Sequence, residues 1–168
     1  MQSNTPEVVL RIPAATDGPA LTELVSLCPP LDENSRYCNL LQCSHFAETA
    51  VVAELDGQLV GAITGYRHPG HSDVLFVWQV AVLSSMRGQR LAKRMLRHVL
   101  ERPQSADIRY IETTITPDND ASWGLFESIA RSLDAPLNKS VLFEKKRHFA
   151  GAHDDEMLCR IGPFSINS

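Results

Sequence analysis

The chain has 168 residues, of which 43% are hydrophobic and 21% charged, with a formal net charge of -4. This length and composition predict a single domain over residues 1–168 and exclude a disordered chain. The acidic balance argues against a nucleic-acid-binding protein, and the longest apolar runs are too short for a membrane span.

The amino-terminal residues and the cysteines indicate the cellular compartment. Residues 1–7 contain no basic segment followed by an apolar one, so we expect no secretory signal and a cytoplasmic location. The four cysteines form no C-x-x-C pair and match neither a zinc site nor a dense disulfide framework. We therefore expect reduced thiols and no metal.

The first half of the chain predicts one strand, two helices and two further strands. Capping residues precede each helix, and the Pro29-Pro30 pair ends the first one. Asp56-Gly57, between two apolar runs, is a typical hairpin turn. The predicted elements are a strand at 8–12, a helix from Thr16–Pro19 to Cys28, a helix from Asn34 and Ser35 to Leu41, and strands at 50–55 and 58–66.

The second half alternates strands and helices. The run at 75–83 is almost continuously apolar, which is typical of a strand buried on both faces. The order of elements predicts a mixed α/β (α+β) layout around one sheet. The remaining elements are a helix at 91–100, a strand at 109–115, a helix at 119–133 with Ser122, Leu125, Phe126 and Ile129 inward, and strands at 141–143 and 156–161.

The segment from Ser84 to Arg97 has the features of a phosphate-binding turn. A strand ends near Leu83, and a short turn leads directly into a helix whose first N–H groups lack helical partners. A solvated basic helix face is the alternative. The motifs of P-loops and dinucleotide-binding turns are absent, so another polyanionic cofactor is predicted. No acidic residue lies between Asp73 and Glu101, whereas five basic residues do: Arg87, Arg90, Lys93, Arg94 and Arg97.

This segment and the strand before it resemble motif A of the GCN5-related N-acetyltransferases, whose pattern is [QR]-x-x-G-x-[GA]. Arg87 and Ala92 match, but Arg90 stands where the family usually has Gly. The resemblance implies a GNAT fold, with a mixed central sheet flanked by helices on both faces, and acetyl-CoA as co-substrate. The cofactor-binding residues that it implies here are Val80, Ala81, Val82, Arg87, Gly88, Gln89, Arg90, Leu91 and Ala92.

A second match lies in the helix after residue 118. Asn119, Ser122 and Phe126 resemble the family's Asn-led helix beside acetyl-CoA, which implies that they bind it too. The family often has Tyr at position 126, where it serves as general acid for the leaving thiolate. Phe126 has no proton to donate, so the acid lies elsewhere or the thiolate leaves unassisted, which a thiol pKa of about 8.5 allows.

Four further blocks resemble a subgroup of this family that acetylates a small diamino acid. This resemblance extends from about residue 9 to residue 164 and implies transfer of the acetyl group to the γ-amine of L-2,4-diaminobutyrate, a step in biosynthesis of the compatible solute ectoine. It also implies a homodimer. The blocks are P-L-D-x-N-S-x-Y at 30–37, L-F-V-W-Q-V-A-V at 75–82, E-T-T-I-T-P-D-N at 112–119 and the segment from His148 to Glu156.

A substrate with two ammonium groups needs carboxylates around it and few competing cations. Tyr37 and Trp78 can enclose its alkyl chain, although Trp78 is equally compatible with a plain core position. Glu112, in a β-rich run, is the first candidate for the general base; its alternative role is a glutamate at a sheet edge. The candidate substrate-binding residues are Asp32, Tyr37, Trp78, Glu112, Thr113, His153 and Glu156, of which Glu112, His153 and Glu156 are the catalytic candidates.

The expected mechanism is direct attack of the amine on the thioester in a ternary complex. An N–H near Val80, exposed by a local splay or bulge of the strand, would stabilise the oxyanion. Three alternatives stay open: an acetyltransferase for another small amine or a peptide N-terminus, a non-catalytic acyl-CoA-binding sensor, and a metal-dependent module. The metal-dependent module would use His148, His153, Asp154 and Glu156, whose spacing fits no common zinc pattern.

Overall fold

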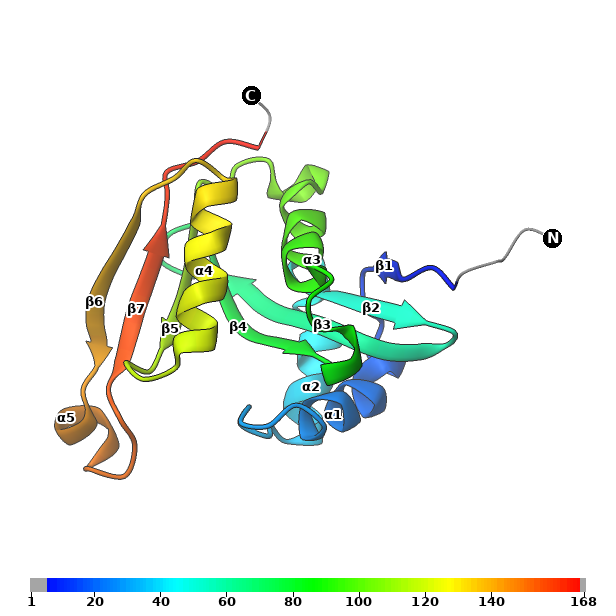
Figure 1. Cartoon of the computed structure of the whole chain (residues 1–168), viewed down its shortest axis with the longest axis horizontal. Helices are drawn as coiled ribbons and strands as arrows, with labels where there is room; N and C mark the ends of the chain where they lie inside the picture. The colour runs from blue at the N-terminus through cyan, green and yellow to red at the C-terminus, as the bar shows by residue number, and fades with distance from the viewer. Residues whose placement is uncertain (1–5, 167–168) are drawn as a thin grey trace. The chain divides into compact units, whose positions relative to one another are not determined.

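The computed structural model describes residues 6–166, which form two compact units (Figure 1). The first unit comprises the chain up to Tyr66 together with Trp78–Ser105, and the second comprises Arg67–Val77 and the chain from Ala106 onward. Seven strands follow the order β1-β2-β3-β4-β5-β7-β6, and β4 (Val74–Val82) contributes to both units. The mixed sheet is confirmed, and the single domain stays a prediction.

Three antiparallel strands build most of the sheet in the first unit. They are β1 (Val9–Arg11), β2 (Val51–Leu55) and β3 (Gln58–Arg67). The predicted hairpin turn joins β2 to β3, because Asp56 and Gly57 both adopt positive φ, at 50° and 80°.

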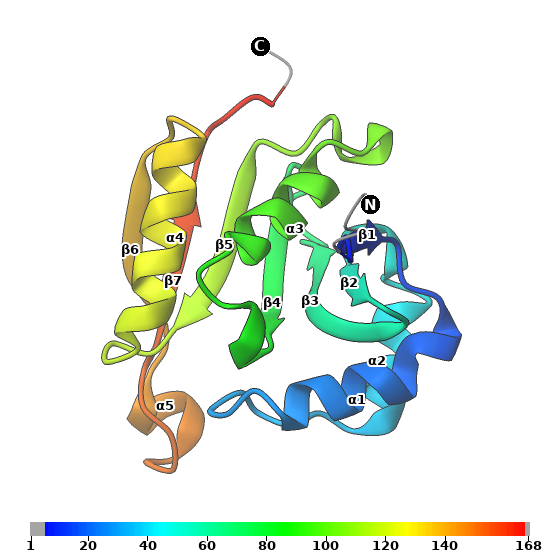
Figure 2. The same ribbon diagram turned by 45° about the vertical axis from the view of Figure 1, so that its right-hand side comes forward.

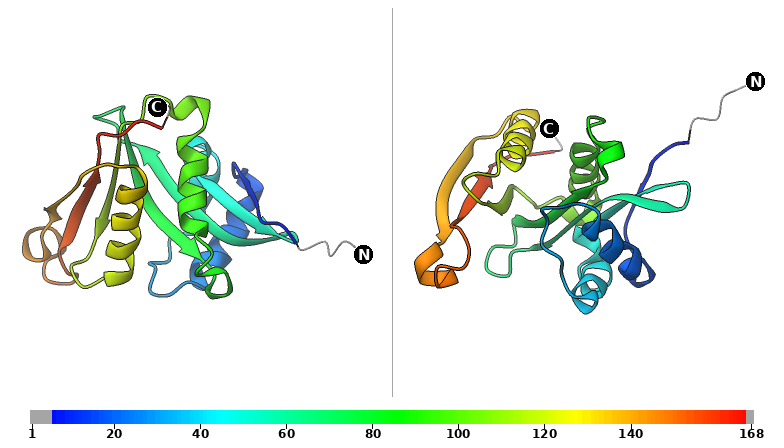
Figure 3. Two further views of the ribbon diagram at one scale, coloured as in Figure 1. Left: turned by 45° about the horizontal axis from the view of Figure 1, so that its top comes forward. Right: turned by 60° about the horizontal axis from the view of Figure 1, so that its bottom comes forward.

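Helices cover both faces of the sheet of the first unit. Helices α1 (Gly18–Ser26) and α2 (Arg36–Cys43) lie on one face, and α3 (Leu91–Leu100) lies on the other (Figure 3). The predicted cap of α2 is confirmed, because Ser35 Oγ accepts a hydrogen bond from the N–H of Cys38 at 3.0 Å. The carboxylate of Asp17 does not cap α1, because it pairs with Arg11 and the N–H of Ala14.

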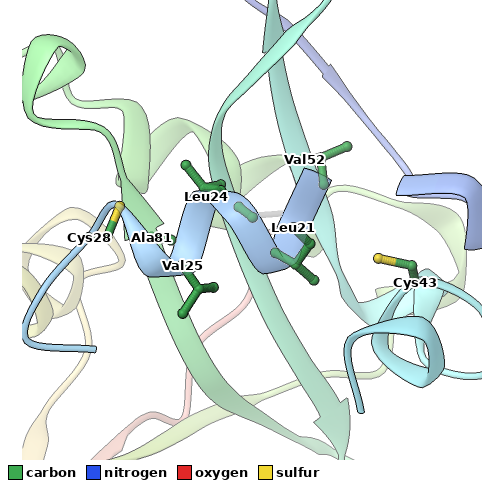
Figure 4. Packing of buried hydrophobic residues seen from close by; sticks show 8 residues of the cluster. Leu21, Leu24, Val25, Cys28, Cys43, Val52 and Ala81 are labelled. Carbon is green, nitrogen blue, oxygen red and sulfur yellow. The ribbon is translucent and has the colours of Figure 1, made fainter. Parts of the chain in front are cut away.

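The core under α1 explains why apolar residues recur at helical spacing in that segment. Leu21, Leu24 and Val25 are 2% exposed and pack on the sheet, where Val52 and Ala81 face them (Figure 4). Each buried leucine or valine stabilises the fold by about 1.5–3 kcal/mol. The core of the first unit therefore fixes both α1 and the second half of β4.

Glycine at position 61 permits close packing of α3 on the other face. A Cβ at this position would lie 3.1 Å from Leu91 Cδ2 and from Met95 Cε. Gly61 pairs with Ala53, and the next residue, Ala62, pairs with Val52. Successive residues of a strand point to opposite faces, so the face that meets α3 carries the small residues Gly61 and Ala53. This contact positions the amino-terminal end of α3.

The second unit has its own strands and one long helix. The first half of β4 pairs in parallel with β5 (Tyr110–Ile115), which pairs with β7 (Glu156–Ile161), and β6 (Leu137–Phe143) forms the edge. Helix α4 (Asp120–Ser132) lies across β7 (Figures 1 and 2). The chain also forms α5 (Lys145–Phe149), which the sequence did not predict because five largely basic residues show no apolar period.

Two predictions of burial are wrong in part. The first half of β4 is buried, but Trp78 in its second half is 42% exposed, because the pairing with β5 ends at Phe76. In α4 the inward residues are Trp123, Phe126, Ile129 and Ala130, whereas Ser122 and Leu125 are only half-buried. No helix among residues 6–166 is long and apolar enough to cross a membrane.

Short 3₁₀ turns connect these elements. They lie at Ala15–Asp17, Ala47–Thr49, Ser84–Met86 and Pro103–Ser105.

Candidate functional site

The turn before α3 has the backbone of an anion-binding site. Gly88 has a φ of 80°, and Arg90, the residue that precedes α3, has a φ of 59° and lies in the left-handed region. No side chain caps the helix at Arg90, so the first N–H groups of α3 keep no capping partner. These groups and the positive end of the helix dipole favour an anionic ligand.

The charges around this turn are arranged for the same ligand. Arg97 pairs with Glu101 at 2.7 Å. Within the described part of the chain, no carboxylate forms an ion pair with any of the other cations of the turn and of α3, so they can meet an external polyanion. These cations are Arg87, Arg90, Lys93 and Arg94.

The other predicted cofactor residues of the first unit surround this turn. Ala81 and Leu91 are each 2% exposed and belong to the core, whereas Val80, Val82 and Ala92 are half-buried. Gly88 and Gln89 are exposed. Only backbone atoms of the two core residues could therefore meet a ligand.

Cys28 lies close to the same segment. Burial raises the pKa of its thiol, and the positive charge of Arg87 and the N–H of Val82 offset this only in part. A buried thiol with a raised pKa is a poor nucleophile, so a covalent cysteine intermediate is not favoured here.

The predicted substrate residues of the first unit lie in exposed positions. Tyr37 is 70% exposed and Trp78 is 42% exposed, so the alternative role of Trp78 as a core residue is wrong. Gln79 was not predicted, but it connects the loop after α1 to β4: its Nε2 donates to the carbonyl of Asp32 at 2.7 Å, and its Oε1 accepts from Asn34 at 3.0 Å. This clamp holds Asp32 at the start of the second half of β4.

Glu112 lies on an interior strand, so its alternative role at a sheet edge is wrong. It pairs with Phe76 on one side and Arg160 on the other. It is 7% exposed, and its Oε1 accepts a hydrogen bond from Arg160 Nη1 at 2.9 Å. A buried carboxylate with a cationic partner is typical of a site residue rather than of a solvated surface.

Thr113 contacts β4 through its side chain, at the point where the regular pairing of β4 and β5 has ended. The register between β4 and β5 ends at Phe76 and Glu112, and the hydroxyl of Thr113 then donates to the carbonyl of Val77 at 2.8 Å. The register of β4 and β5 therefore ends before β4 reaches Val80, and the exposed N–H expected near Val80 stays a prediction.

The structure brings His153 and Glu156 together in the second unit. His153 Nδ1 lies 2.7 Å from the carbonyl of Asp154, and its Nε2 lies 3.7 Å from Glu156 Oε1. A carbonyl oxygen only accepts, so His153 Nδ1 donates this hydrogen bond, and the other ring nitrogen faces the Glu156 carboxylate. The ring also packs against Phe149, with 4.6 Å between ring centroids and an angle of 38° between the ring planes.

The start of α4 has the predicted asparagine. Asn119 Oδ1 accepts a hydrogen bond from the N–H of Ser122 at 3.2 Å and so caps the helix. Phe126 is 4% exposed, so it packs inward. It offers a ligand neither a polar atom nor much accessible surface.

A hollow of about 750 Å³ beside α5 is lined by none of the predicted catalytic, substrate-binding or cofactor-binding residues; of the alternative metal set it holds Asp154 alone. Four of the charged residues around it form ion pairs with each other: Lys145 with Asp154 at 3.6 Å and Arg147 with Glu144 at 3.4 Å. Among residues 6–166 no group of three or more His, Cys, Asp and Glu residues could hold a metal ion.

Sequence reasoning missed Gln79 and Arg160, which hold Asp32 and Glu112. The signal for Arg160 was a charged residue inside an otherwise apolar late strand, but its partner lies 48 positions away. Only the register of β5 and β7 reveals the pair.

Comparison with known proteins identifies the class of enzyme to which this fold and this basic turn belong. The Acetyltransferase (GNAT) family matches residues 19–130. The chain belongs to this family, and both the predicted resemblance and the predicted GNAT fold are confirmed.

Two relatives narrow this class further. The chain is 55% identical to L-2,4-diaminobutyric acid acetyltransferase of Methylotuvimicrobium alcaliphilum, over 95% of this chain and 92% of that protein. It is 48% identical to the enzyme of the same name from Bordetella parapertussis, over 93% of this chain and 84% of that protein.

A solved structure agrees with these relatives. Diaminobutyrate acetyltransferase EctA from Paenibacillus lautus, in complex with its substrate L-2,4-diaminobutyric acid and coenzyme A, has a TM-score of 0.90 to this chain. The two are 40% identical, and the match covers 98% of this chain and 99% of that one.

Proposed function

We propose that this chain transfers the acetyl group of acetyl-CoA to the γ-amine of L-2,4-diaminobutyrate, a step of ectoine biosynthesis. The single observation that supports this most is the 0.90 TM-score, at 40% identity, to an enzyme solved with L-2,4-diaminobutyric acid and coenzyme A. The match to the GNAT family extends across residues of both units, so we propose that residues 1–168 serve this one reaction as one domain.

The turn before α3 is the proposed site for the pyrophosphate of acetyl-CoA. Its uncapped N–H groups and unpaired cations fit a group with several negative charges. Val80–Val82 would line the pantetheine arm with backbone atoms. From the second unit, Asn119 and Ser122 are the proposed further contacts with acetyl-CoA, and the buried Phe126 would act only by supporting the helix that carries them.

Carboxylates and aromatic rings are the proposed partners of the diamino acid. Glu112, Glu156 and Asp32 would neutralise its ammonium groups. Tyr37 and Trp78, both exposed, offer ring faces to the alkyl chain and to a cation. Thr113 and His153 complete the proposed set with a hydroxyl and an imidazole.

We propose direct transfer in a ternary complex. The amine must first lose a proton, and Glu112 would accept it directly or through water, with His153 or Glu156 as the second candidates. The amine nitrogen then attacks the thioester carbon, so that a C–N bond forms and the C–S bond breaks. Position 126 holds Phe, so the thiolate leaves without help from that residue, and an N–H near Val80 would stabilise the oxyanion.

We also propose that the protein is a cytoplasmic homodimer with no nucleic-acid or membrane partner. The edge strand β6 supports the dimer, because Val141, Leu142 and Phe143 at its end are 39–48% exposed. Analytical ultracentrifugation would test the proposed homodimer, and a monomer would contradict it.

The test of the reaction is thiol release from acetyl-CoA over a panel of amines. The panel contains diaminobutyrate, ornithine, lysine, diaminopropionate, simple amines and peptides, and selective release with diaminobutyrate is expected. Release with another amine would agree with an acetyltransferase of this family but would contradict diaminobutyrate as its substrate. Binding of CoA without release from any amine would favour a non-catalytic acyl-CoA sensor.

Initial-rate kinetics test the order of events. A ternary complex gives intersecting double-reciprocal lines when both substrates are varied. Parallel lines would indicate a covalent acetyl-enzyme instead.

A further inference from the structure

Arg160 lies directly opposite Glu112 in the sheet of the second unit. The two residues are register partners on the antiparallel strands β5 and β7, so their side chains leave the same face of the sheet. Arg160 Nη1 donates to Glu112 Oε1 at 2.9 Å. This ion pair follows from strand pairing and does not depend on a flexible loop.

A second contact fixes the guanidinium from another side. Arg160 Cζ lies 4.0 Å from the ring centre of Tyr110. Tyr110 precedes Glu112 by two residues on β5, so both side chains point to the same face. A planar guanidinium can stack on a ring and donate in its own plane at once, which lysine cannot do.

The burial of Glu112 explains why a partner is needed. The Glu112 side chain is 9% exposed, whereas that of Arg160 is 38% exposed. A buried carboxylate without a partner is strongly destabilising, and Arg160 removes that penalty. Within the described part of the chain, the hydrogen bond goes to Oε1 alone, so Oε2 receives none.

We propose that Arg160 is a positioning residue for acetyl transfer: it holds Glu112 by Oε1, so that Oε2 faces the substrate amine. The inference depends on the proposed function, because it assigns Glu112 the contact with that amine. The ring of Tyr110, which contacts the guanidinium, helps to hold Arg160 in this position. A carboxylate held at one oxygen loses little conformational freedom when the other oxygen binds an ammonium or accepts its proton.

The test compares three substitutions at position 160 with a control on α4. Arg160→Met removes the positive charge but keeps an unbranched aliphatic side chain. Arg160→Gln keeps a hydrogen-bond donor without the charge. Arg160→Lys keeps the charge without the planar guanidinium group. Arg131→Met is the matched control, because Arg131 is exposed near the end of α4. Each variant is measured for kcat, for KM of diaminobutyrate and of acetyl-CoA separately, and for Tm.

We expect Arg160→Met to lower kcat for diaminobutyrate by about 10–100-fold, because the contribution of a general base falls when it is misplaced. The KM for acetyl-CoA should stay within about twofold. Arg160→Lys should recover part of kcat and Arg160→Gln less, whereas the control should resemble the unmodified protein. If Arg160→Met keeps kcat while Glu112→Gln loses it, Arg160 does not position Glu112 and the proposed function is unaffected.

A double-mutant cycle separates positioning from mere stability. In a Glu112→Gln background, Arg160→Met should lower kcat by less than about twofold, because no base is left to position. A purely structural role predicts equal loss in both backgrounds. If Arg160→Met does not fold, the cycle is repeated with Arg160→Lys. If Glu112→Gln itself retains kcat, or if the unmodified protein does not acetylate diaminobutyrate, the proposal is overturned.

Discussion

The basic turn before α3 and the Glu112–Arg160 pair hold charge in opposite ways. Arg87, Arg90 and Arg94 are exposed and have no carboxylate partner among the described residues, whereas Glu112 is 7% exposed and already paired. Exposed cations are stable alone because water solvates them, so their interaction with an anion is still available. A buried carboxylate needs its partner before any substrate arrives. The turn is therefore suited to binding, and the pair is suited to precise placement.

Removing the carboxylate tests this contrast most strongly. Glu112→Gln should lower turnover by at least about 100-fold, because the amide cannot accept the proton. The Kd for CoA should change less than about twofold, since the cation turn is intact. Thiol-release kinetics and calorimetry measure the two effects, with Glu127→Gln on the surface of α4 as control. A large change in CoA affinity with normal turnover would show that Glu112, and not the basic turn, determines cofactor binding.

Removing a cation from the turn should have the opposite signature. Arg87→Ala should raise the Kd for CoA by about tenfold, the effect of losing one charge-assisted hydrogen bond of about 1.4 kcal/mol. The loss should be larger at low salt, and kcat with saturating acetyl-CoA should be unchanged. Titration calorimetry at two salt concentrations measures this, and Arg131→Ala is the control. A salt-independent Kd would show that Arg87 does not meet a phosphate.

Arg90 separates the effect of charge from the effect of backbone conformation within the basic turn, because it is both strained and cationic. Its φ of 59° is costly for a side chain and free for Gly. Arg90→Gly should raise Tm by about 2–4 °C while it raises the Kd for CoA a few-fold. The opposite change nearby, Gly88→Ala at a φ of 80°, should lower Tm. If Arg90→Gly lowers Tm, the left-handed conformation is not a source of strain.

A third charged group, Arg102, has neutral partners and gives the smallest expected effect. Its Nη1 donates to the carbonyls of Glu48 and Ala50, and its Nη2 lies 3.0 Å from His98 Nδ1. Since arginine only donates, His98 must accept in its neutral form. Burial, and then the charge of Arg102, lower the pKa of His98 below its ordinary value of 6.5.

The sign of the resulting pH dependence is fixed. Above about pH 6.5 histidine is neutral in both folded and unfolded chains, and this contribution to stability is complete. As the pH falls below that value, the unfolded chain binds the proton first and stability is lost. Tm should therefore fall more steeply from about pH 7.5 to about pH 5.5 in the unmodified protein than in His98→Gln. Equal slopes would contradict this account.

Local patterns were sufficient for most elements of the fold. The bounds of α3 and β7 agree with the predicted 91–100 and 156–161, because α3 has a clear apolar period and β7 is a short, mostly apolar run. The Asp56-Gly57 turn and the Ser35 cap depend only on neighbouring residues, and both are confirmed. The phosphate turn was visible for the same reason, since its cations lie within one short segment.

Features that depend on distant residues were not predicted. The sequence pointed to Glu112 but not to Arg160, which becomes its neighbour only through the register of β5 and β7. It also overestimated the burial of β4, because an apolar run does not reveal where a neighbouring strand stops pairing.

The most direct measurement of the central claim is the position of the acetyl group on the product. The protein is incubated with acetyl-CoA and L-2,4-diaminobutyrate, and the product is examined by two-dimensional NMR. The account predicts a single product in which the acetyl carbonyl couples to the protons on the γ-carbon. A product acetylated on the α-nitrogen, or no product beside free substrate, would contradict it.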